Sequence, residues 1–215
     1  GWGQPSVFNA DSVAEELLRQ GKSIEDARCG GTSGCVETGA FGKECYILTG
    51  YFNLVKVLEI TMYNGTDPMS GKKTGIETGD ISTFTSFEQL MEAFRKQLHY
   101  FIDIKVRGNH TIEKLYAGQM PSPFLSVVVS DCIKNGRDYN AGGARYNTSY
   151  IHGVGIGSIT DCLSSIKYNV FEKKILTAEK LMKALDSNFE GSEDIRKLFL
   201  NKTPKYGNDD RYADE

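Results

Sequence analysis

Glycine density is the feature of this 215-residue sequence that most restricts its fold. Five of the fourteen residues from Cys29 to Gly42 are glycine, and a second glycine-rich stretch runs from Gly136 to Gly157. Because glycine loses more conformational freedom on folding than any other residue, neither a helix nor a regular strand tolerates this density well. Both stretches are therefore predicted to be loops whose backbone conformation serves a specific purpose.

Amphipathic patterns and capping residues predict helices on both sides of these loops. In the first of them, Asp11 or Ser12 is expected to cap the N-terminus and Gly21 to follow the C-terminus. The run Phe124–Val129 is ambiguous between helix and strand. Helices are expected over residues 10–20, 52–64, 158–168, 177–187 and 192–200. The chain is therefore predicted to be helix-rich and of the α/β class.

One predicted helix is unusually long. Thr85 to Glu88 has the pattern of a capping box, with Glu88 at the third helical position. An apolar stripe runs from Phe87 to Phe101, and a helix continuing to Tyr116 would have about 30 residues and a length of about 45 Å. This length fits a larger assembly better than a separate small domain.

Charge and hydrophobicity exclude several classes of partner. Lysine and arginine total 25 against 28 aspartate and glutamate, which gives a formal net charge of −3 without a basic block. Neither a nucleic acid nor an anionic membrane surface is therefore an expected partner. No apolar run approaches the ~18 residues that a membrane span needs. The five cysteines include no CxxC pair, which favours free thiols in a reducing compartment, the cytoplasm.

The sharpest local feature is the sequence Gly34-Cys35-Val36-Glu37. In an extended segment, Cys35 and Glu37 point to the same side, about 6.5 Å apart along the chain. A sulfur and a carboxylate so placed could flank one substrate carbon, one removing hydrogen and the other moving a proton. A buried structural cysteine beside a surface glutamate is the more common explanation of such a pair taken alone.

A second use of Cys35 is as a thiolate nucleophile with a histidine base. The three histidines available are His99, His110 and His152, and the first two belong to the long predicted helix. Single histidines of this kind are more often solvated or satisfied in a core. No protease signature surrounds the cysteine, so this alternative is weaker.

Two other patterns resemble ligand sites without meeting their requirements. Gly153 to Gly157 reads GxGxG and lacks the acidic partner of a dinucleotide site, so a tight turn into the next helix is expected there. The acidic residues of the 209–215 tail are expected to be solvated rather than to bind a metal. No bound cofactor or metal is predicted for this segment.

Four motifs occur in an order and spacing that is typical of one family. They are RCGGTSGCVETGAFGKECYILTGYFN (Arg28–Asn53), GGARYN (Gly142–Asn147), GVGIGSITDCL (Gly153–Leu163) and NKTPKYGNDDRYADE (Asn201–Glu215). With these motifs, the sequence resembles the glycyl radical enzymes of the pyruvate formate-lyase-like superfamily over essentially its whole length. Cys162 and Cys45 depart from the usual residues of this pattern, outside the Cys35–Glu37 core.

The resemblance implies a fold and a place within it. Residues 1–215 would be the central part of a ten-stranded α/β barrel domain, incomplete on its own, with the catalytic cysteine loop at about 28–42. The C-terminal glycyl radical domain, with its RVAGY-type motif, would lie outside this segment. The segment alone is therefore expected to be inactive.

The resemblance also implies roles for individual residues. Cys35 would be the thiyl-radical residue, and Glu37 would be the acid/base glutamate of the dehydratase and decarboxylase branches. Val36 excludes the formate-lyase branch, which has a second cysteine at this position. A small molecule would be the substrate. The radical would be installed by an iron-sulfur activating enzyme that uses S-adenosylmethionine, and the full-length protein would be a homodimer.

The branch is suggested by GCVETGAFGKE, LTGYFN and QLHYFIDIK (Gln97–Lys105), which look most like enzymes that dehydrate trans-4-hydroxy-L-proline to 1-pyrroline-5-carboxylate. In that branch Tyr51 would line the substrate pocket. Glycerol or diol dehydratases and 4-hydroxyphenylacetate-type decarboxylases remain as alternatives. A non-enzymatic alternative is a helical interaction module that docks a partner along the Phe87–Phe101 stripe.

Overall fold

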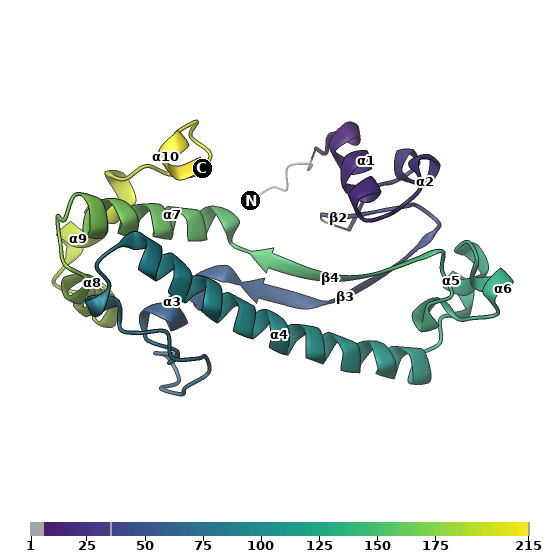
Figure 1. Cartoon of the computed structure of the whole chain (residues 1–215), viewed down its shortest axis with the longest axis horizontal. Helices are drawn as coiled ribbons and strands as arrows, with labels where there is room; N and C mark the ends of the chain where they lie inside the picture. The colour runs from purple at the N-terminus through teal and green to yellow at the C-terminus, as the bar shows by residue number, and fades with distance from the viewer. Residues whose placement is uncertain (1–6, 35, 215) are drawn as a thin grey trace. The chain divides into compact units, whose positions relative to one another are not determined.

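The computed structural model of the chain describes residues 7–34 and 36–214, without the side chains of residues 48 and 49. The chain divides into two compact units, one of residues 1–50 and 106–152 and the other of residues 51–105 and 153–215 (Figure 1). Three elements continue from one unit into the other: β3 (Glu44–Asn53), α4 (Phe87–Gln119) and β4 (Tyr146–Val154).

The remaining elements belong to one unit each. The first unit contains α1 (Ala10–Arg19), α2 (Ile24–Arg28), β1 (Gly31–Ser33), β2 (Glu37–Gly39), α5 (Pro123–Val128), α6 (Cys132–Asn135) and the 3₁₀ turn η2 (Tyr139–Ala141). The second contains α3 (Leu54–Met62), the 3₁₀ turn η1 (Ile81–Thr83), α7 (Ile156–Ile166), the π-helix η3 (Lys167–Glu172), α8 (Ala178–Asp186), α9 (Glu193–Asn201) and α10 (Arg211–Asp214). The predicted helix-rich α/β composition is confirmed.

The two glycine-rich stretches contain strands, so the expectation of loops without regular strands was wrong. Strands β1 and β2 form an antiparallel pair in which Gly31 lies opposite Gly39. Strand β4 occupies much of the second glycine-rich stretch and is the neighbour of β3 (Figure 1). The arrows of β3 and β4 point the same way, which requires the long crossover connection that contains α3 and α4.

Helix starts differ from the sequence predictions in detail. Asn9, rather than Asp11 or Ser12, caps α1, because its Oδ1 accepts the N–H groups of both residues, at 2.9 and 3.1 Å. Thr177, the first residue of the predicted 177–187 helix, caps α8. Helix α7 begins after Gly155, which has a φ of +91°, so the tight turn expected there is confirmed but the helix starts before Ser158.

The long helix is confirmed as α4, with 33 residues and a length of about 50 Å. It begins at Phe87, and the side chain that accepts the N–H of Thr85 is Gln89 rather than Glu88, with a distance of 2.7 Å. Glu88 is therefore the second residue of the helix rather than the third, and the predicted capping box was wrong in this detail. The ambiguous run after α4 forms the helix α5.

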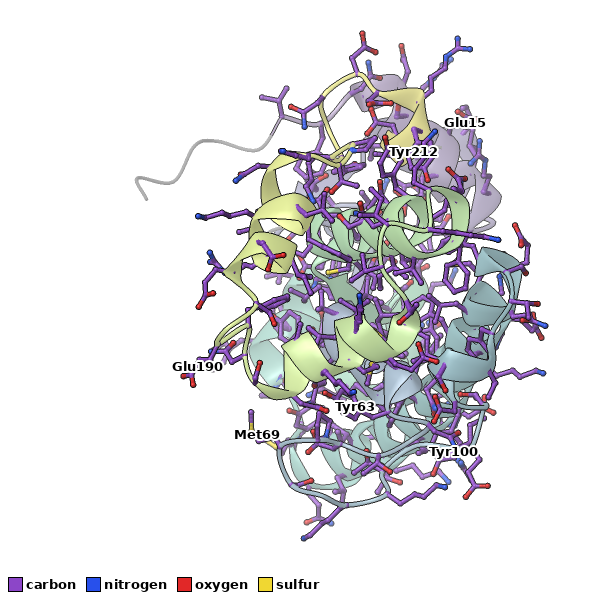
Figure 2. The ribbon with its side chains drawn as sticks, turned by 90° about the vertical axis from the view of Figure 1, so that its left-hand side faces the viewer. Glu15, Tyr63, Met69, Tyr100, Glu190 and Tyr212 are labelled. Carbon is purple, nitrogen blue, oxygen red and sulfur yellow. The ribbon has the colours of Figure 1, made fainter. Side chains whose placement is uncertain are left out.

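The core of the second unit is apolar and contains the stripe of α4. Leu90 and Phe94 are buried there, and Phe87, Leu98 and Phe101 pack against the same cluster. The stripe is therefore core rather than the open docking surface that the interaction-module alternative needs. The connector between α3 and α4 is polar, and the side chain of Met69 projects from it into solvent (Figure 2).

Candidate functional site

Gly34, Val36 and Glu37 lie at the tip of the β1–β2 hairpin. Ser33 pairs with Glu37 across the hairpin, and Gly34 and Val36 lie between these two paired residues. Gly34 has a φ of +61°, a conformation that favours glycine. Cys35 lies outside the described residues, so its predicted placement beside Glu37 on one extended face stays a prediction.

Glu37 is folded back against this tip. The residue is only 9% exposed, and its Oε2 accepts the N–H of Val36 at 3.0 Å. A Cβ atom at position 34 would lie 2.5 Å from the same Oε2. The backbone conformation therefore favours a glycine at position 34, and any side chain there would displace the Glu37 carboxylate.

Strand β4 contacts β2 through two side chains on one of its faces. The Tyr150 hydroxyl donates a hydrogen bond to the carbonyl oxygen of Thr38. His152 Nε2 lies 3.6 Å from Glu37 Oε1. Burial raises the pKa of Tyr150 well above its ordinary value, so its hydroxyl is a neutral donor. Of the three histidines, His152 is the one that the structure brings to the Cys35–Glu37 motif; His99 and His110 are exposed on α4.

A buried ion pair supports the other end of β2. Lys22 Nζ lies 3.1 Å from Glu44 Oε1, and their side chains are only 2% and 0% exposed. Glu44 also accepts the N–H of Ala40 at 2.8 Å and the hydroxyl of Thr148. This network joins the end of the hairpin to β3 and β4. Sequence reasoning missed it because its members are separated by 22 and 104 positions and have no local pattern.

The GGARYN motif has a structural role of its own. Arg145 and Tyr146 both donate to Asp26 Oδ2, at 3.1 and 2.8 Å, and Lys43 also pairs with this carboxylate. Lys43 is the largest cause of a pKa of Asp26 well below its ordinary value, and Tyr146 and Arg145 lower it further. Arg145 Nε also donates a hydrogen bond to Asp131 Oδ2 at 2.9 Å. The motif therefore attaches the start of β4 to the helix that precedes the hairpin.

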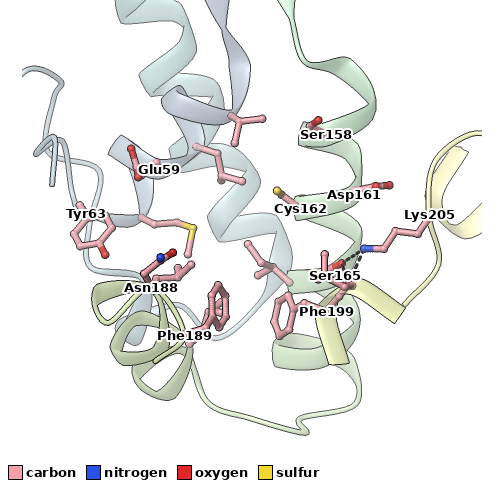
Figure 3. Close-up of a pocket in the computed structure, with 17 residues that line it drawn as sticks. Glu59, Tyr63, Ser158, Asp161, Cys162, Ser165, Asn188, Phe189, Phe199 and Lys205 are labelled. Atoms are coloured by element: carbon pink, nitrogen blue, oxygen red, sulfur yellow. Dashed lines mark hydrogen bonds between the residues drawn. The ribbon is translucent and has the colours of Figure 1, made fainter. Parts of the chain in front are cut away.

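The second unit contains a cavity of 710 Å³ between α3, α7 and the residues around α8 and α9 (Figure 3). Its walls are largely apolar, and several of its polar groups have partners within the protein. Lys205 Nζ, for example, donates to Ser165 Oγ and to the carbonyl oxygen of Phe199, at 3.0 and 2.7 Å. Burial raises the pKa of the Cys162 thiol, which disfavours a thiolate there.

Tyr51, the predicted substrate contact, lies in β3 in the second unit, and its side chain is 64% exposed. Its role stays a prediction. Within residues 7–34 and 36–214, no cluster of three or more histidine, cysteine or acidic side chains could hold a metal ion. Among these same residues, no helix is both long and apolar enough to cross a membrane.

The hairpin therefore combines a buried carboxylate and a nearby imidazole. Its second strand is fixed by the hydrogen bonds of Tyr150 to Thr38 and of Ala40 to Glu44. A carboxylate that is oriented and shielded from bulk water is suited to proton transfer to one specific substrate atom.

The pyruvate formate lyase-like family matches residues 1–215. The chain therefore belongs to this family, the glycyl radical enzymes, as its motifs predicted. Its match to solved glycyl radical enzymes also confirms the predicted fold class, a helix-rich part of an α/β barrel enzyme.

Among individual relatives, a trans-4-hydroxy-L-proline dehydratase of Clostridioides difficile is 63% identical over 215 residues, which are 100% of this chain and 27% of that protein. A crystal structure of hydroxyproline dehydratase from the same organism, with trans-4-hydroxy-L-proline bound, has 62% identity and a TM-score of 0.94 over 99% of this chain and 27% of its own. A glycerol-bound, B12-independent glycerol dehydratase from Clostridium butyricum has 34% identity and a TM-score of 0.88 over 98% of this chain and 26% of its own. The chain thus spans about a quarter of the length of these relatives.

Proposed function

We propose that the chain is part of a glycyl radical dehydratase that converts trans-4-hydroxy-L-proline into 1-pyrroline-5-carboxylate and water. The observation that carries this proposal is the 63% identity to a trans-4-hydroxy-L-proline dehydratase over the whole chain. The structural match to a hydroxyproline dehydratase with its substrate bound, at a TM-score of 0.94, supports it. The family membership supports the broader class, a carbon–oxygen lyase.

The glycyl radical lies outside this segment and supplies the unpaired electron that a cysteine needs to abstract hydrogen. In our proposal that cysteine is Cys35, which takes a hydrogen atom from C5 of the substrate, next to the ring nitrogen. Glu37 gives a proton to the C4 hydroxyl, which leaves as water, and its carboxylate then takes the proton of the ring nitrogen. Cys35 returns hydrogen to C4. The net change is the loss of one water molecule.

The described part of the hairpin supports these roles. Glu37 is buried and oriented by the Val36 N–H, so its proton can be directed to one substrate atom. We further propose Tyr51 as a substrate contact, on the basis of the LTGY motif in which it stands.

The remaining proposals concern the full-length protein. We place residues 1–215 in the central part of the barrel domain, with the glycyl radical domain elsewhere in the polypeptide. Its partners would be an iron-sulfur activating enzyme that uses S-adenosylmethionine and a second copy of itself in a cytoplasmic homodimer. The free thiols of Cys29, Cys45, Cys132 and Cys162 fit a reducing compartment.

A diol dehydratase is the second candidate, because the glycerol dehydratase structure matches the chain at 34% identity. It would use the same Cys35 and Glu37 and differ in the pocket around the substrate. A decarboxylase of arylacetates has weaker support, from an indoleacetate decarboxylase of Tractidigestivibacter scatoligenes at 29% identity. The interaction-module alternative loses its support, since the relatives are lyases.

The test uses the full-length protein, activated anaerobically and checked for its radical by electron paramagnetic resonance. Separate reactions contain trans-4-hydroxy-L-proline, glycerol, 1,2-propanediol or 4-hydroxyphenylacetate. We expect 1-pyrroline-5-carboxylate from hydroxyproline and no product from the other three. The variant Glu37→Gln should keep the radical and lose at least about a hundredfold in kcat. A radical without turnover of hydroxyproline, together with dehydration of a diol, would replace the first candidate by the second.

A further inference from the structure

One face of β4 contacts β2 through two side chains, those of Tyr150 and His152. Residues two apart in a strand point to the same side, so Tyr150 and His152 share a face. Tyr150 donates to the Thr38 carbonyl, and its ring stacks on Tyr46 of β3 with centroids 5.8 Å apart. His152, the next residue on this face, has its Nε2 atom 3.6 Å from Glu37 Oε1. The strand that carries the imidazole is thus fixed against the strand that carries the carboxylate.

The two oxygens of Glu37 face different partners. Oε2 accepts the Val36 N–H at 3.0 Å, and Oε1 faces His152. The side chains of His152 and Glu37 are only 14% and 11% exposed, so little water competes for the carboxylate. In such a site a hydrogen bond is stronger than it is at the surface. Contacts on both oxygens fix the rotation of the carboxylate about its last bond.

We propose that His152 is a positioning residue for Glu37, donating an Nε2–H hydrogen bond to Oε1 and so holding the carboxylate in its reactive orientation. This role rests on the proposed function of Glu37 in proton transfer. The separation of 3.6 Å must shorten by a few tenths of an ångström to reach hydrogen-bond length, and such bonds often tighten when substrate binds. A carboxylate misplaced by about 1 Å can cost about a hundredfold in rate.

Three variants of the full-length protein separate this role from simple packing. His152→Gln keeps an N–H donor at nearly the reach of Nε2, and His152→Asn has the same amide one methylene shorter. His152→Leu removes the donor. His110→Gln is the matched control, because His110 is an exposed histidine on α4 of the same unit.

Two measurements are made on each variant. Crystal structures of the unactivated protein locate the Glu37 carboxylate, and this readout is independent of the substrate. Steady-state kinetics of the activated protein give kcat and KM, with the radical content measured by electron paramagnetic resonance. If the Leu variant does not fold, the Asn and Gln pair carries the same comparison.

We expect the Leu and Asn variants to displace the Glu37 carboxylate and to lower kcat at least tenfold, with KM within about threefold of wild type and unchanged radical content. The Gln variant should restore both the carboxylate position and most of kcat. A carboxylate that stays in place in the Leu and Asn variants, or a kcat within twofold of wild type, would overturn the proposal. If wild-type enzyme carries the radical without converting hydroxyproline, the proposed substrate fails, and the carboxylate position alone decides the role of His152.

Discussion

The two units of the chain bury different kinds of side chain. Among the described residues, the buried charged side chains all belong to the first unit, namely Lys22, Asp26, Glu37 and Glu44. The polar side chains buried in the second unit are neutral and stand in an apolar core that includes Leu58, Leu90 and Leu181. The second unit has the larger core and the cavity of 710 Å³. The chemistry that fits a reaction is nevertheless found in the first unit.

This difference shows how each unit is stabilised. An apolar core needs only shape complementarity, and it tolerates hydrophobic replacements of similar volume. A buried charge persists only when its partners compensate for lost hydration, so removal of one partner is costly. Lys22, Glu44 and Asp26 meet this condition through specific hydrogen bonds and ion pairs, and Asp26 is paired with the exposed Arg145. These bonds fix the elements next to the hairpin in one arrangement, which suits a site that must hold Glu37 in place.

The largest expected effect comes from breaking the buried pair of the first unit. Lys22→Met leaves the Glu44 carboxylate buried without its cation, which should cost about 4 kcal/mol of local stability. Hydrogen exchange of the full-length protein should accelerate by at least a hundredfold in the hairpin and at the start of β4. The control is Lys73→Met, which breaks an exposed pair with Glu77 and should have a much smaller effect, because water screens this pair. Equal effects of the two variants would contradict the distinction between the units.

The second prediction concerns the apolar core. Leu90→Ala removes a fully buried side chain of α4 and should cost about 3 kcal/mol through lost burial and the cavity left behind. Faster exchange should be confined to the second unit, in α3, α7 and α8. Leu90→Met should be nearly neutral, because its volume is similar. Faster exchange in the β1–β2 hairpin would show that the two units do not respond separately.

Gly34 tests the hairpin tip with a smaller change in stability. Gly34→Ala places a side chain at a φ of +61° and a Cβ 2.5 Å from the Glu37 carboxylate. We expect a loss of about 1 to 2 kcal/mol, from the backbone conformation and from displacement of Glu37. The rate of the activated enzyme should fall by more than this stability loss explains. Gly42→Ala is the control, since Gly42 also has a positive φ but has open space around a Cβ. A wild-type rate in Gly34→Ala would contradict the placement of Glu37.

The Asp26 network should leave stability independent of pH near neutrality and should make it depend on pH in acid. Folding lowers the pKa of Asp26 from 3.8. The contribution of Asp26 to the free energy of unfolding is therefore complete above about pH 4 and is lost as the pH falls below that value. The pKa of Lys43 is raised from 10.5, so its contribution is complete below that pH and is lost as the pH rises further.

The measurement compares wild type with Asp26→Asn by hydrogen exchange in α2 and the start of β4, corrected for intrinsic rates. The difference in exchange rate between the two proteins should be constant from pH 5 to 9 and should shrink below pH 4. A difference that persists unchanged at pH 3 would show that Asp26 is not held ionised by its partners.

Local patterns predicted the helices well, because each helix carries its own signals. The apolar stripe from Phe87 to Phe101 gave the long helix, and Thr177 gave the start of α8. The strands were not predicted, because apolar and polar residues do not alternate regularly along them. β4 includes Gly153 and its pairing partner β3 is almost a hundred residues earlier in the chain, so only the folded structure brings the two together.

The candidate site was predictable only in part. The residues Cys35 and Glu37 were singled out by their spacing, and the family resemblance gave them roles. His152 was treated as a single histidine, because its proximity to Glu37 depends on the positions of β2 and β4. The ion pairs of Lys22 and Asp26 likewise join residues that are distant in sequence. Such contacts follow from the fold and have no sequence signal of their own.

The central claim is that the reaction takes place at the hairpin of the first unit and not in the cavity of the second. Each region has one cysteine to replace: Cys35 belongs to the hairpin motif in the sequence, and Cys162 lines the cavity. The most direct test compares Cys35→Ser with Cys162→Ser in the activated full-length enzyme, at equal radical content, by formation of 1-pyrroline-5-carboxylate. We predict that Cys35→Ser abolishes turnover while Cys162→Ser retains at least half of it. Turnover that survives in Cys35→Ser and disappears in Cys162→Ser would contradict the claim and place the chemistry in the cavity.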